Sequence, residues 1–283
     1  MDIHKSRLFA ESWNVAYRKK SSEGFPKDLD TPFTVIRNSY RYWAADPFVF
    51  EKDGETYIFA ELYDYLRKRG AIGYCRLSDP QKTWTPVIRE SFHLSYPYLF
   101  SRDGQIYMIP ESSQNASLLL YRAVRFPDLW EKVKVLRNNV RYVDTTPFSA
   151  FGKDLALSYD LSDPCLRILD FSDGQDRVAD DSSPELKRPA GHIDFDRRIR
   201  AAQDCSVDYG KGLVFYRFDL GEDMSYSERE ILRIYPEDLQ FSGKYYLDGM
   251  HTYHRSEHCE VVDVKTRRFN LLNLAVRTIS KLK

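Results

Sequence analysis

The sequence predicts an all-β fold, a five-bladed β-propeller, from an internal repeat and from the turn chemistry inside that repeat. Residues 45–61 read ADPFVFEKDGETYIFAE and residues 95–111 read SYPYLFSRDGQIYMIPE, and the two segments align without a gap at an offset of 50 residues. In both, Asp-Gly stands between alternating apolar and polar residues, which is the strongest short-range signal of a β-hairpin. Three or four short strands repeated about every 50 residues are typical of propeller blades.

Weaker copies of the hairpin extend the repeat along the chain. They cover residues 144–160, 202–218 and 248–264, which gives five units, and further strand candidates follow the hairpins at 71–77, 117–123, 166–171 and 229–235. A two-sheet sandwich would also have short strands and turns, but it would not explain the offset of 50. We therefore predict a single propeller domain over residues 1–264.

The two ends of the chain predict how the ring closes. Residues 8–18 are strand-like but precede the first full unit, and too little chain follows the fifth unit to complete a blade. We expect the N-terminal strand to complete the last blade, because this removes an exposed sheet edge. The remaining segment, 265–283, is basic and has a partial helical periodicity. A short amphipathic helix there could pack on the propeller or make a peripheral contact with an anionic membrane.

Composition excludes several classes of protein. The chain has 283 residues with Tyr 20, Phe 17 and Trp 4, and its 42 basic residues balance 42 acidic ones. Such an aromatic chain folds around a large core, and the balanced charge argues against a nucleic-acid partner. The four cysteines form no Cys-x-x-Cys pair, so buried free thiols are expected. Without a signal peptide or a long apolar run, we expect a cytoplasmic protein.

Cross-strand pairing in the predicted hairpins places polar side chains at equivalent positions of the five units. If the first turn lies between Asp53 and Gly54, residues whose numbers sum to 107 face each other, so Asp46 faces Glu61. The same rule predicts these pairs in the later units: Tyr96 with Glu111, Asp144 with Asp160, Asp204 with Arg217, and His251 close to Glu260. Because the first strand of each blade lines the axis of a propeller, we expect the first member of each pair to lie at one mouth of the channel.

An axial pocket of this composition suits a sugar. Carboxylates accept bonds from sugar hydroxyls, and aromatic rings stack on the apolar sugar faces. Two carboxyl groups in different environments also meet the needs of glycosidic chemistry, in which one is protonated and the other ionised. The predicted substrate-binding residues are Trp43, Glu61, Tyr96, Asp160, Arg200 and His251.

Motifs for metals and cofactors are weak. The run His251-x-x-His254-x-x-x-His258 could bind a metal, but its members differ in strand parity, and surface histidines are the simpler interpretation. Asp194-Phe-Asp196 matches a three-letter metal-binding triplet of nucleotide-sugar transferases, a pattern of little specificity. Phosphate-loop, dinucleotide-binding and zincin motifs do not occur. We therefore expect neither a metal nor a cofactor.

The segments WAADPFVF, SYPYLF, DTTPF and AAQDCSVDYG, in this order, resemble the five-bladed propeller domain at the N-terminal side of plant glucosamine inositolphosphorylceramide transferase, and bacterial homologues associated with surface polysaccharide synthesis. More distantly, the Asp-Pro of the first blade is similar to that of glycoside hydrolase family 43 propellers. In that family this Asp is the general base, which maps onto Asp46. Tyr96 stands where those hydrolases commonly have an Asp, which argues against simple hydrolysis.

The resemblance implies a carbohydrate-active enzyme. We expect Asp46 to act as base or nucleophile, and Asp144, Asp204 or Glu111 to act as the acid. The expected reaction is transfer of a glycosyl group from an activated sugar donor to a saccharide or glycolipid, in surface polysaccharide or glycolipid synthesis. Two alternatives stay open, a furanosidase-like glycoside hydrolase and a non-catalytic glycan-binding module.

Overall fold

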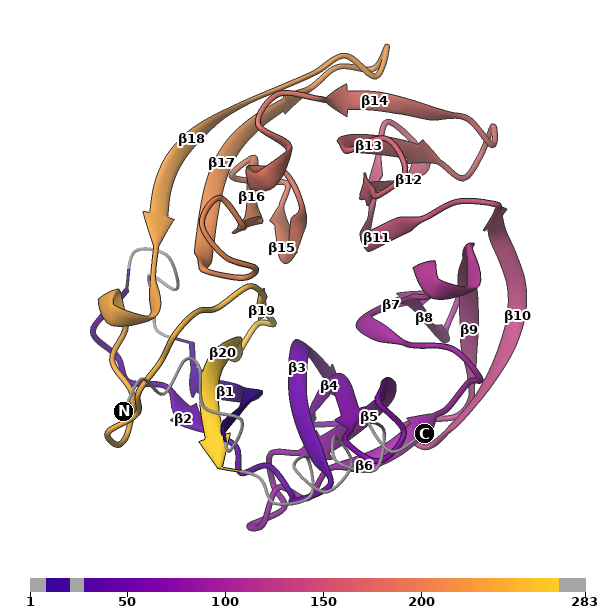
Figure 1. The fold of residues 1–283 in the computed structure, drawn as a ribbon. Coiled ribbons are helices and arrows are strands. Elements are labelled where there is room, and N and C mark those ends of the chain that lie inside the picture. Colours follow the sequence, from indigo (N-terminus) through magenta and orange to yellow (C-terminus); the bar gives the residue numbers. More distant parts are fainter. Residues whose placement is uncertain (1–8, 21–27, 270–283) are drawn as a thin grey trace, which may run out of the picture.

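The computed structural model describes residues 9–20 and 28–269, and their β-strands form a ring of sheets around a central axis (Figure 1). Three sheets have four antiparallel strands each. Their members are β3 (Tyr42–Lys52), β4 (Glu55–Asp64), β5 (Arg69–Arg76) and β6 (Thr85–Ile88); β7 (Ser95–Arg102), β8 (Gln105–Glu111), β9 (Ser117–Arg125) and β10 (Leu129–Asn138); and β11 (Tyr142–Ala150), β12 (Lys153–Asp160), β13 (Cys165–Asp170) and β14 (Asp176–Asp180).

The fourth sheet has eight strands and divides into two blades. Its order is β18-β17-β16-β15-β19-β20-β1-β2, and one parallel pair, Gly191 with Tyr253, joins the two four-stranded halves. These strands are β15 (Pro189–Asp194), β16 (Ile199–Asp204), β17 (Gly212–Leu220), β18 (Tyr226–Ile234), β19 (Tyr253–Arg255), β20 (Cys259–Phe269), β1 (Phe9–Lys19) and β2 (Thr34–Val35). The fold is therefore a five-bladed β-propeller, and β3, β7, β11, β15 and β19 lie nearest the axis (Figure 1).

The N-terminal strand closes the last blade, as predicted. β1 lies between β20 and β2 and pairs with β20 along its whole length, from Phe9 opposite Phe269 to Lys19 opposite Cys259. Val15 and Ala16 of β1 are fully buried in the core clusters on either side of this blade. The closing strand is thus part of the hydrophobic core and also satisfies the edge of β20.

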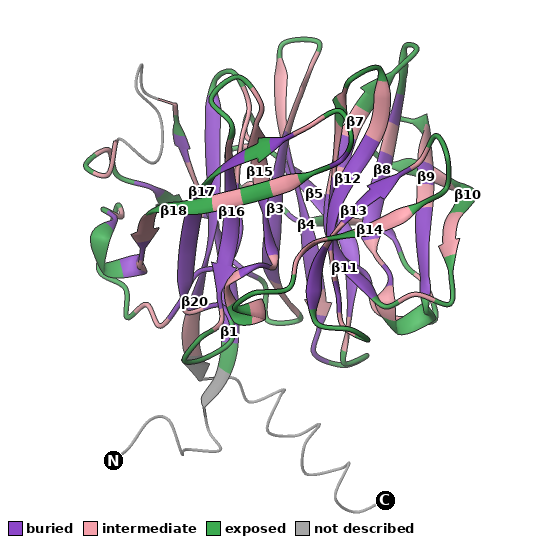
Figure 2. Cartoon of the chain, turned by 90° about the horizontal axis from the view of Figure 1, so that it is seen from above, coloured by how far each residue is buried: buried purple, intermediate pink, exposed green. Residues whose placement is uncertain are grey.

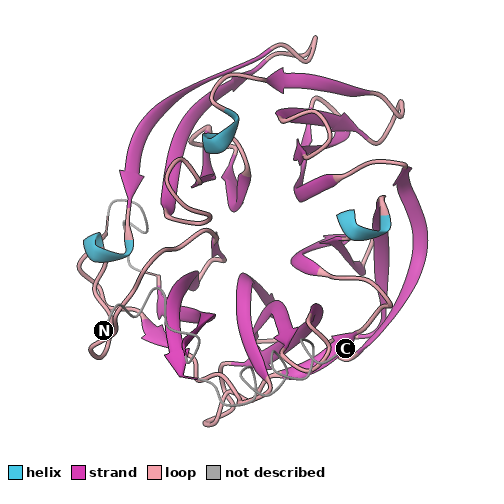
Figure 3. Cartoon of the chain, in the orientation of Figure 1, coloured by secondary structure: helices cyan, strands magenta, loops and turns pink. Residues whose placement is uncertain are grey.

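Helical structure is limited in the described part of the chain to three short 3₁₀ turns, Ser113–Asn115, Pro184–Leu186 and Pro236–Asp238 (Figure 3). No helix among these residues is long and apolar enough to cross a membrane. β20 continues to Phe269, past the domain boundary that the sequence suggested at residue 265. The rest of the expected helical tail, 270–283, lies outside the described residues.

The core lies between neighbouring blades, where the sheets pack face to face (Figure 2). Between the first two blades it is rich in aromatic side chains, with Phe48 and Phe59 from one sheet against Tyr96 and Met108 from the other. The cysteines are free thiols, as expected, and Cys205 alone among them is not buried.

The fourth repeat is displaced by one strand from its predicted position. The segment 202–218 contains the second and third strands of its blade, so Asp204 ends β16 and lies opposite Gly212 rather than Arg217. The true first hairpin, β15–β16, turns through residues 195–198, which contain no Asp-Gly or Gly. The Gly210 turn joins the second and third strands of the blade, and its glycine is a stronger turn signal than residues 195–198, so the sequence pattern places this repeat one strand too late.

Because β1 closes the ring and is part of the core, a charge inside this strand is expected to destabilise the fold strongly. Val15→Asp places a carboxylate in the core and is expected to lower the free energy of unfolding by on the order of 3 kcal/mol or more. Lys19→Asp, at an exposed position of the same strand, is the control and is expected to change it by less than about 1 kcal/mol. Urea denaturation measures both, and equal midpoints would contradict a core role for β1.

Candidate functional site

Three backbone bulges bring polar side chains to the axis. In the first blade the register shifts between Ala45 and Phe48, so that Ala45 rather than Asp46 lies opposite Glu61. Equivalent shifts follow Ser95 in the second blade and Val143 in the third. The bulged residues Asp46, Tyr96 and Asp144 have left-handed backbone conformations, with φ of 50°, 45° and 52°. The predicted pairings are therefore wrong by one position in the first two blades and by two in the third, where Tyr142 lies opposite Asp160. Because a bulge re-aims the side chain it carries, Asp46 and Asp144 still turn toward the axis.

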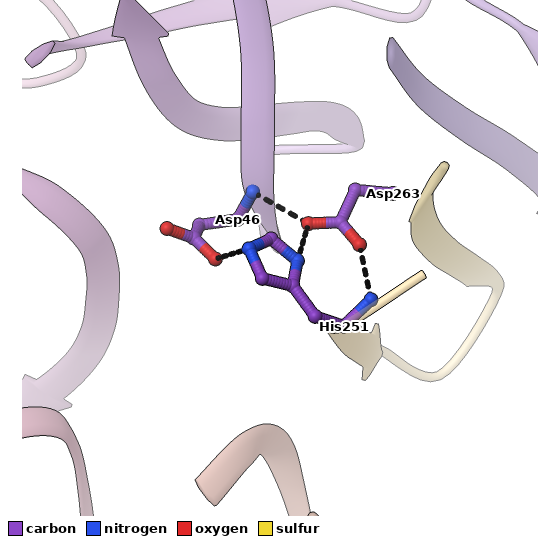
Figure 4. A group of neighbouring side chains, drawn as sticks. All are labelled: Asp46, His251 and Asp263. Carbon is purple, nitrogen blue, oxygen red and sulfur yellow. Dashed lines mark hydrogen bonds and ion pairs between the residues drawn. The ribbon is translucent and has the colours of Figure 1, made fainter. Parts of the chain in front are cut away.

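Asp46 lies in a buried network with His251 and Asp263 (Figure 4). One oxygen of Asp46 accepts a bond from the Thr252 hydroxyl at 2.8 Å and lies 3.6 Å from His251 Nε2. Asp263 accepts the backbone N–H groups of Asp46, His251 and Thr252 at 2.9–3.0 Å, and its Oδ2 lies 2.6 Å from His251 Nδ1. This network fixes the Asp46 carboxyl from two blades.

Burial raises the pKa of Asp46 to about 6, although the nearby His251 opposes the shift. For His251, burial alone would lower the pKa, but the carboxylates of Asp263 and Asp46 outweigh it and the pKa is raised. At neutral pH the pair is therefore an ionised or partly ionised carboxylate beside a ring that favours its charged form.

Glu61 lies beside Asp46 in a different environment. The residue is 5% exposed, and its Oε1 has no hydrogen-bond partner among the described residues. The nearest ring nitrogen, His93 Nε2, is 3.5 Å away, and His93 Nδ1 accepts the Gly70 N–H at 2.9 Å, which leaves the proton of a neutral ring on Nε2. Burial raises the pKa of Glu61 well above its usual value, helped by the charges of Asp46 and Glu111, and burial lowers the pKa of His93.

Asp144 and Glu111 share a cation. Arg188 donates through Nε to Asp144 and lies 3.5 Å from Glu111, and its guanidinium stands over the ring of Tyr209. Burial raises the pKa of Asp144 to about 6 and raises that of Glu111, but Arg188 opposes both shifts. These two carboxyls are therefore held closer to the ionised state than Glu61 is.

Asp46, Glu61, Glu111 and their basic partners open into one pocket of about 260 Å³ at the mouth of the axis. Trp43 and Tyr63 form one wall as a parallel stack, with ring centroids 4.7 Å apart. Trp13 stacks on His251 at 4.0 Å and forms another. The pocket is lined by Glu11, Trp13, Trp43, Ala45, Asp46, Glu61, Tyr63, His93, Ser95, Glu111, Arg188, Tyr209 and His251. It combines carboxyl groups, cations and aromatic faces in the space of a small polar ligand.

The structure brings together most of the predicted residues. Trp43, Asp46, Glu61, Glu111 and His251 line the pocket, and Asp144 reaches it through Arg188. Tyr96 is fully buried beneath it, where its hydroxyl pairs with Thr146 at 2.8 Å and accepts the Gly191 N–H at 2.5 Å.

Three predicted residues lie elsewhere. Asp160 binds Arg167 at 2.8 Å at the end of its own hairpin. Arg200 is buried against Glu228 and Tyr226 of β18, the outer strand of its blade. Asp204 binds Ser206 and Arg233, because the fourth repeat is displaced. None of the three lines the axial pocket.

Sequence reasoning missed Arg188, His93, Tyr63 and Asp263. Asp263 could have been found, since it is a lone acid within the apolar run VVDV of a predicted strand. Arg188 could not, because the strand that follows it, β15, has no counterpart in the repeat pattern of the sequence.

The members of the two weak metal-binding patterns do not come together among the described residues. His254 packs on Phe48 at 4.9 Å, while His258 is exposed on a turn. Asp194 pairs instead with Arg255 and Arg197. The ligand atoms of Asp46, His251 and Asp263 do lie within 4.8 Å of one another. However, the oxygens of Asp263 are already occupied by N–H donors, so the trio fits a hydrogen-bonded network better than an ion site.

Comparison with solved structures defines the class of fold. The catalytic domain of a Coprinopsis cinerea α-L-arabinofuranosidase of glycoside hydrolase family 62 matches with a TM-score of 0.51 and 14% identity, covering 86% of this chain and 84% of that one. A family 43 β-xylosidase/α-arabinofuranosidase from a compost metagenome gives 0.53 and 10%, covering 82% and 94%. At these identities the likeness concerns the fold alone.

Comparison by sequence is more specific. The family model described as glucosamine inositolphosphorylceramide transferase 1, N-terminal, matches residues 30–162, which confirms the resemblance predicted above. The Arabidopsis thaliana glucosamine inositolphosphorylceramide transferase 1 is 29% identical over 235 residues, covering 74% of this chain and 30% of that protein. The protein of Oryza sativa subsp. indica is 28% identical over 204 residues, covering 66% and 27%. The chain thus spans less than a third of these relatives.

The raised pKa of Asp46 predicts a pH-dependent effect on stability. A carboxyl with a pKa of about 6 in the folded state and 3.8 as its ordinary value contributes stability below about pH 4 that is lost as the pH rises through 6. Asp46→Asn removes this loss. The free energy of unfolding of the variant minus that of the wild type is expected to rise by on the order of 1 kcal/mol or more from pH 4 to pH 7.

Denaturation curves at several pH values measure this difference. Asp53→Asn, the same chemical change at the exposed turn of the same hairpin, is the matched control. A difference between Asp46→Asn and wild type that stays constant from pH 4 to 7 would contradict the burial argument.

Proposed function

We propose that the chain is a carbohydrate-active enzyme that transfers a glycosyl group to a saccharide or lipid-linked acceptor in surface polysaccharide or glycolipid synthesis, with the axial pocket as its active site. The observation that carries this proposal is a pocket lined by three carboxyl groups, the buried Asp46 and Glu61 and the half-buried Glu111, and by a stacked pair of aromatic rings, with the buried Asp144 paired to Arg188 of the same pocket. Paired carboxyls in unlike environments support acid–base work at a glycosidic bond.

Asp46 is the base in this proposal. Its two oxygens are held by Thr252 and by the Tyr96 N–H at 3.3 Å, and His251 stabilises its ionised form. The carboxylate takes the proton of the acceptor hydroxyl as that oxygen forms its bond to the anomeric carbon. The bond between this carbon and the leaving oxygen breaks in the same step.

Glu61 is the best-placed acid. Arg188 favours the ionised forms of Asp144 and Glu111, whereas the partner nearest to Glu61 is a ring whose pKa is lowered. Burial and the charges of Asp46 and Glu111 therefore favour the protonated form of Glu61, which can give its proton to the leaving oxygen. Afterwards Asp46 carries a proton and Glu61 is a carboxylate, and exchange with solvent restores both.

The relatives are named as transferases, which supports transfer. These proteins are more than three times as long as the segment that matches this chain. The fold likeness to arabinofuranosidases and xylosidases keeps hydrolysis as the second candidate, in which water takes the place of the acceptor hydroxyl. The two reactions share every role assigned above and differ only in the nucleophile.

The first test removes the base. Asp46→Asn keeps the shape of the side chain and removes its charge, so turnover is expected to fall by about 10²–10⁴ while folding is retained. Wild type is incubated with activated sugar donors plus acceptors and, separately, with free glycans, to find which is consumed. Asp53→Asn is the control and keeps wild-type turnover. Full activity of Asp46→Asn would place the active site elsewhere, and glycan binding without turnover would leave a recognition module.

The second test concerns the acid. Glu61→Gln cannot donate a proton, so it is expected to slow substrates with sugar-oxygen leaving groups by about 10²-fold or more, and to spare 4-nitrophenyl glycosides, whose leaving group needs little protonation. Glu111→Gln is the matched control and shows no such selectivity. Equal loss on both kinds of substrate in Glu61→Gln would assign Glu61 to binding instead.

A further inference from the structure

A second hollow, separate from the axial pocket, lies on the outer side of the last blade. It has a volume of about 960 Å³, and its described lining is formed by Asn14, Val35, Arg37, Asn38, Ser39, Tyr40, Lys244, Tyr245, Tyr246, Leu247, Val264, Thr266 and Arg267. Tyr40 is 79% exposed and Tyr246 is 68% exposed. So many solvent-facing rings around one groove are unusual on a globular surface and indicate a ligand.

One wall is a segment whose two ends are fixed. At its start, Phe33 donates its N–H to Gln240 at 2.8 Å and accepts the Ser242 N–H at 2.8 Å. At its end, Asp248 donates to the carbonyl of Lys265 at 2.8 Å, and Lys265 donates to that of Gly249 at 2.7 Å. These bonds hold both ends of the segment 243–247, which carries Lys244, Tyr245 and Tyr246.

Gly243 further positions a ring of this wall. Its φ is 134°, and a Cβ at this position would lie 3.0 Å from the ring of Tyr245. The aromatic ring thus lies close against backbone, and this contact restricts its orientation. A ring held in this way loses little entropy when a ligand stacks on it.

On the opposite wall, hydrogen bonds of the Asn38 side chain fix the connection between β2 and β3. The Asn38 side chain donates to the Trp13 carbonyl at 2.6 Å and to Asn14 Oδ1 at 2.8 Å, and accepts the Ala44 N–H at 3.2 Å. Its neighbours Arg37 and Tyr40 are exposed on the same connection. Both walls therefore carry a cation and at least one tyrosine beside hydrogen-bonded residues.

The groove and the axial pocket have opposite charge. Arg37, Lys244 and Arg267 line the groove, and its described lining includes no Asp or Glu. Arg267 lies 3.4 Å from Asp248, whereas Arg37 and Lys244 form no ion pair within the described residues. The axial pocket instead has more carboxyl groups than cations. A ligand that suits the groove therefore carries negative charge and offers flat apolar faces.

We propose that this groove binds an extended acidic saccharide, a chain of sugars that bear carboxylate groups. The tyrosine rings stack on sugar faces, and Arg37 and Lys244 pair with the carboxylates. A nucleic acid fits less well, because three cations neutralise few phosphates and the chain as a whole has a formal net charge of +0.

The groove acts independently of the proposed catalysis. Trp13 and Asn14 are neighbours on β1, and successive side chains of a strand point to opposite faces, so this strand separates the two sites. Variants of one site can therefore be tested without altering the other.

The experiment measures binding of polygalacturonate, a polymer of uronic acid, by affinity electrophoresis over a range of salt concentrations. Dextran is the neutral saccharide, and single-stranded DNA is the non-saccharide polyanion. The variants are Tyr246→Ala and Lys244→Ala, alone and combined. Lys132→Ala, at an exposed position on β10 of the second blade, is the matched control, and Asp46→Asn tests the axial pocket.

We expect polygalacturonate to retard the wild type, the effect to weaken with salt, and the combined variant to bind about tenfold or more weakly with an unchanged melting temperature. Lys132→Ala and Asp46→Asn bind as wild type does. Absence of binding, equal binding by the combined variant, or equal retardation by DNA or dextran would each overturn the proposal. Loss of binding in Asp46→Asn would assign the polymer to the axial pocket and would also overturn it.

Discussion

The carboxylate of Asp263 is the interaction on which both closure of the ring and the geometry of the site depend. It accepts N–H groups from His251 and Thr252 of the last blade and from Asp46 of the first, and it is fully buried. A buried anion with this many donors is stabilised where it lies, and a hydrogen bond to a charged group is worth about 1.5–3 kcal/mol. The same oxygens that join the first blade to the last therefore fix the backbone from which the proposed base projects.

The bulges explain why the axis can hold so many carboxyl groups. A regular strand would alternate its side chains between the two faces of the sheet, so a polar residue at the start of each first strand would lie between blades. The left-handed conformations of Asp46 and Asp144 turn these side chains toward the axis instead. Such conformations are costly for residues other than glycine, and they persist where the surroundings determine them. Here the surroundings are the Asp263 network and the Arg188 pair.

How far the sequence could predict this arrangement depended on turn chemistry. Asp-Gly turns at 53–54 and 103–104 fixed the offset of the first two blades, and with it the position of Asp46. In the fourth blade the first turn has no such signal, so Asp204 and Arg200 were placed at the axis, whereas each is paired on its own blade. Arg188 and His93 precede strands and belong to no repeated pattern, and only the closed ring brings them beside the acids.

The unlike surroundings of the carboxyl groups follow from the order of blades around the ring. Arg188 enters from the fourth blade and reaches Asp144 and Glu111 of the third and second, but not Glu61 of the first. His251 enters from the fifth blade and reaches Asp46, its neighbour across the closure. Glu61 instead faces His93, whose lowered pKa favours the uncharged imidazole. This partner therefore supplies no positive charge to balance an ionised Glu61. Arg188 and His251 thus favour the ionised forms of Asp144, Glu111 and Asp46, and the proposed function takes the remaining carboxyl, Glu61, as the proton donor.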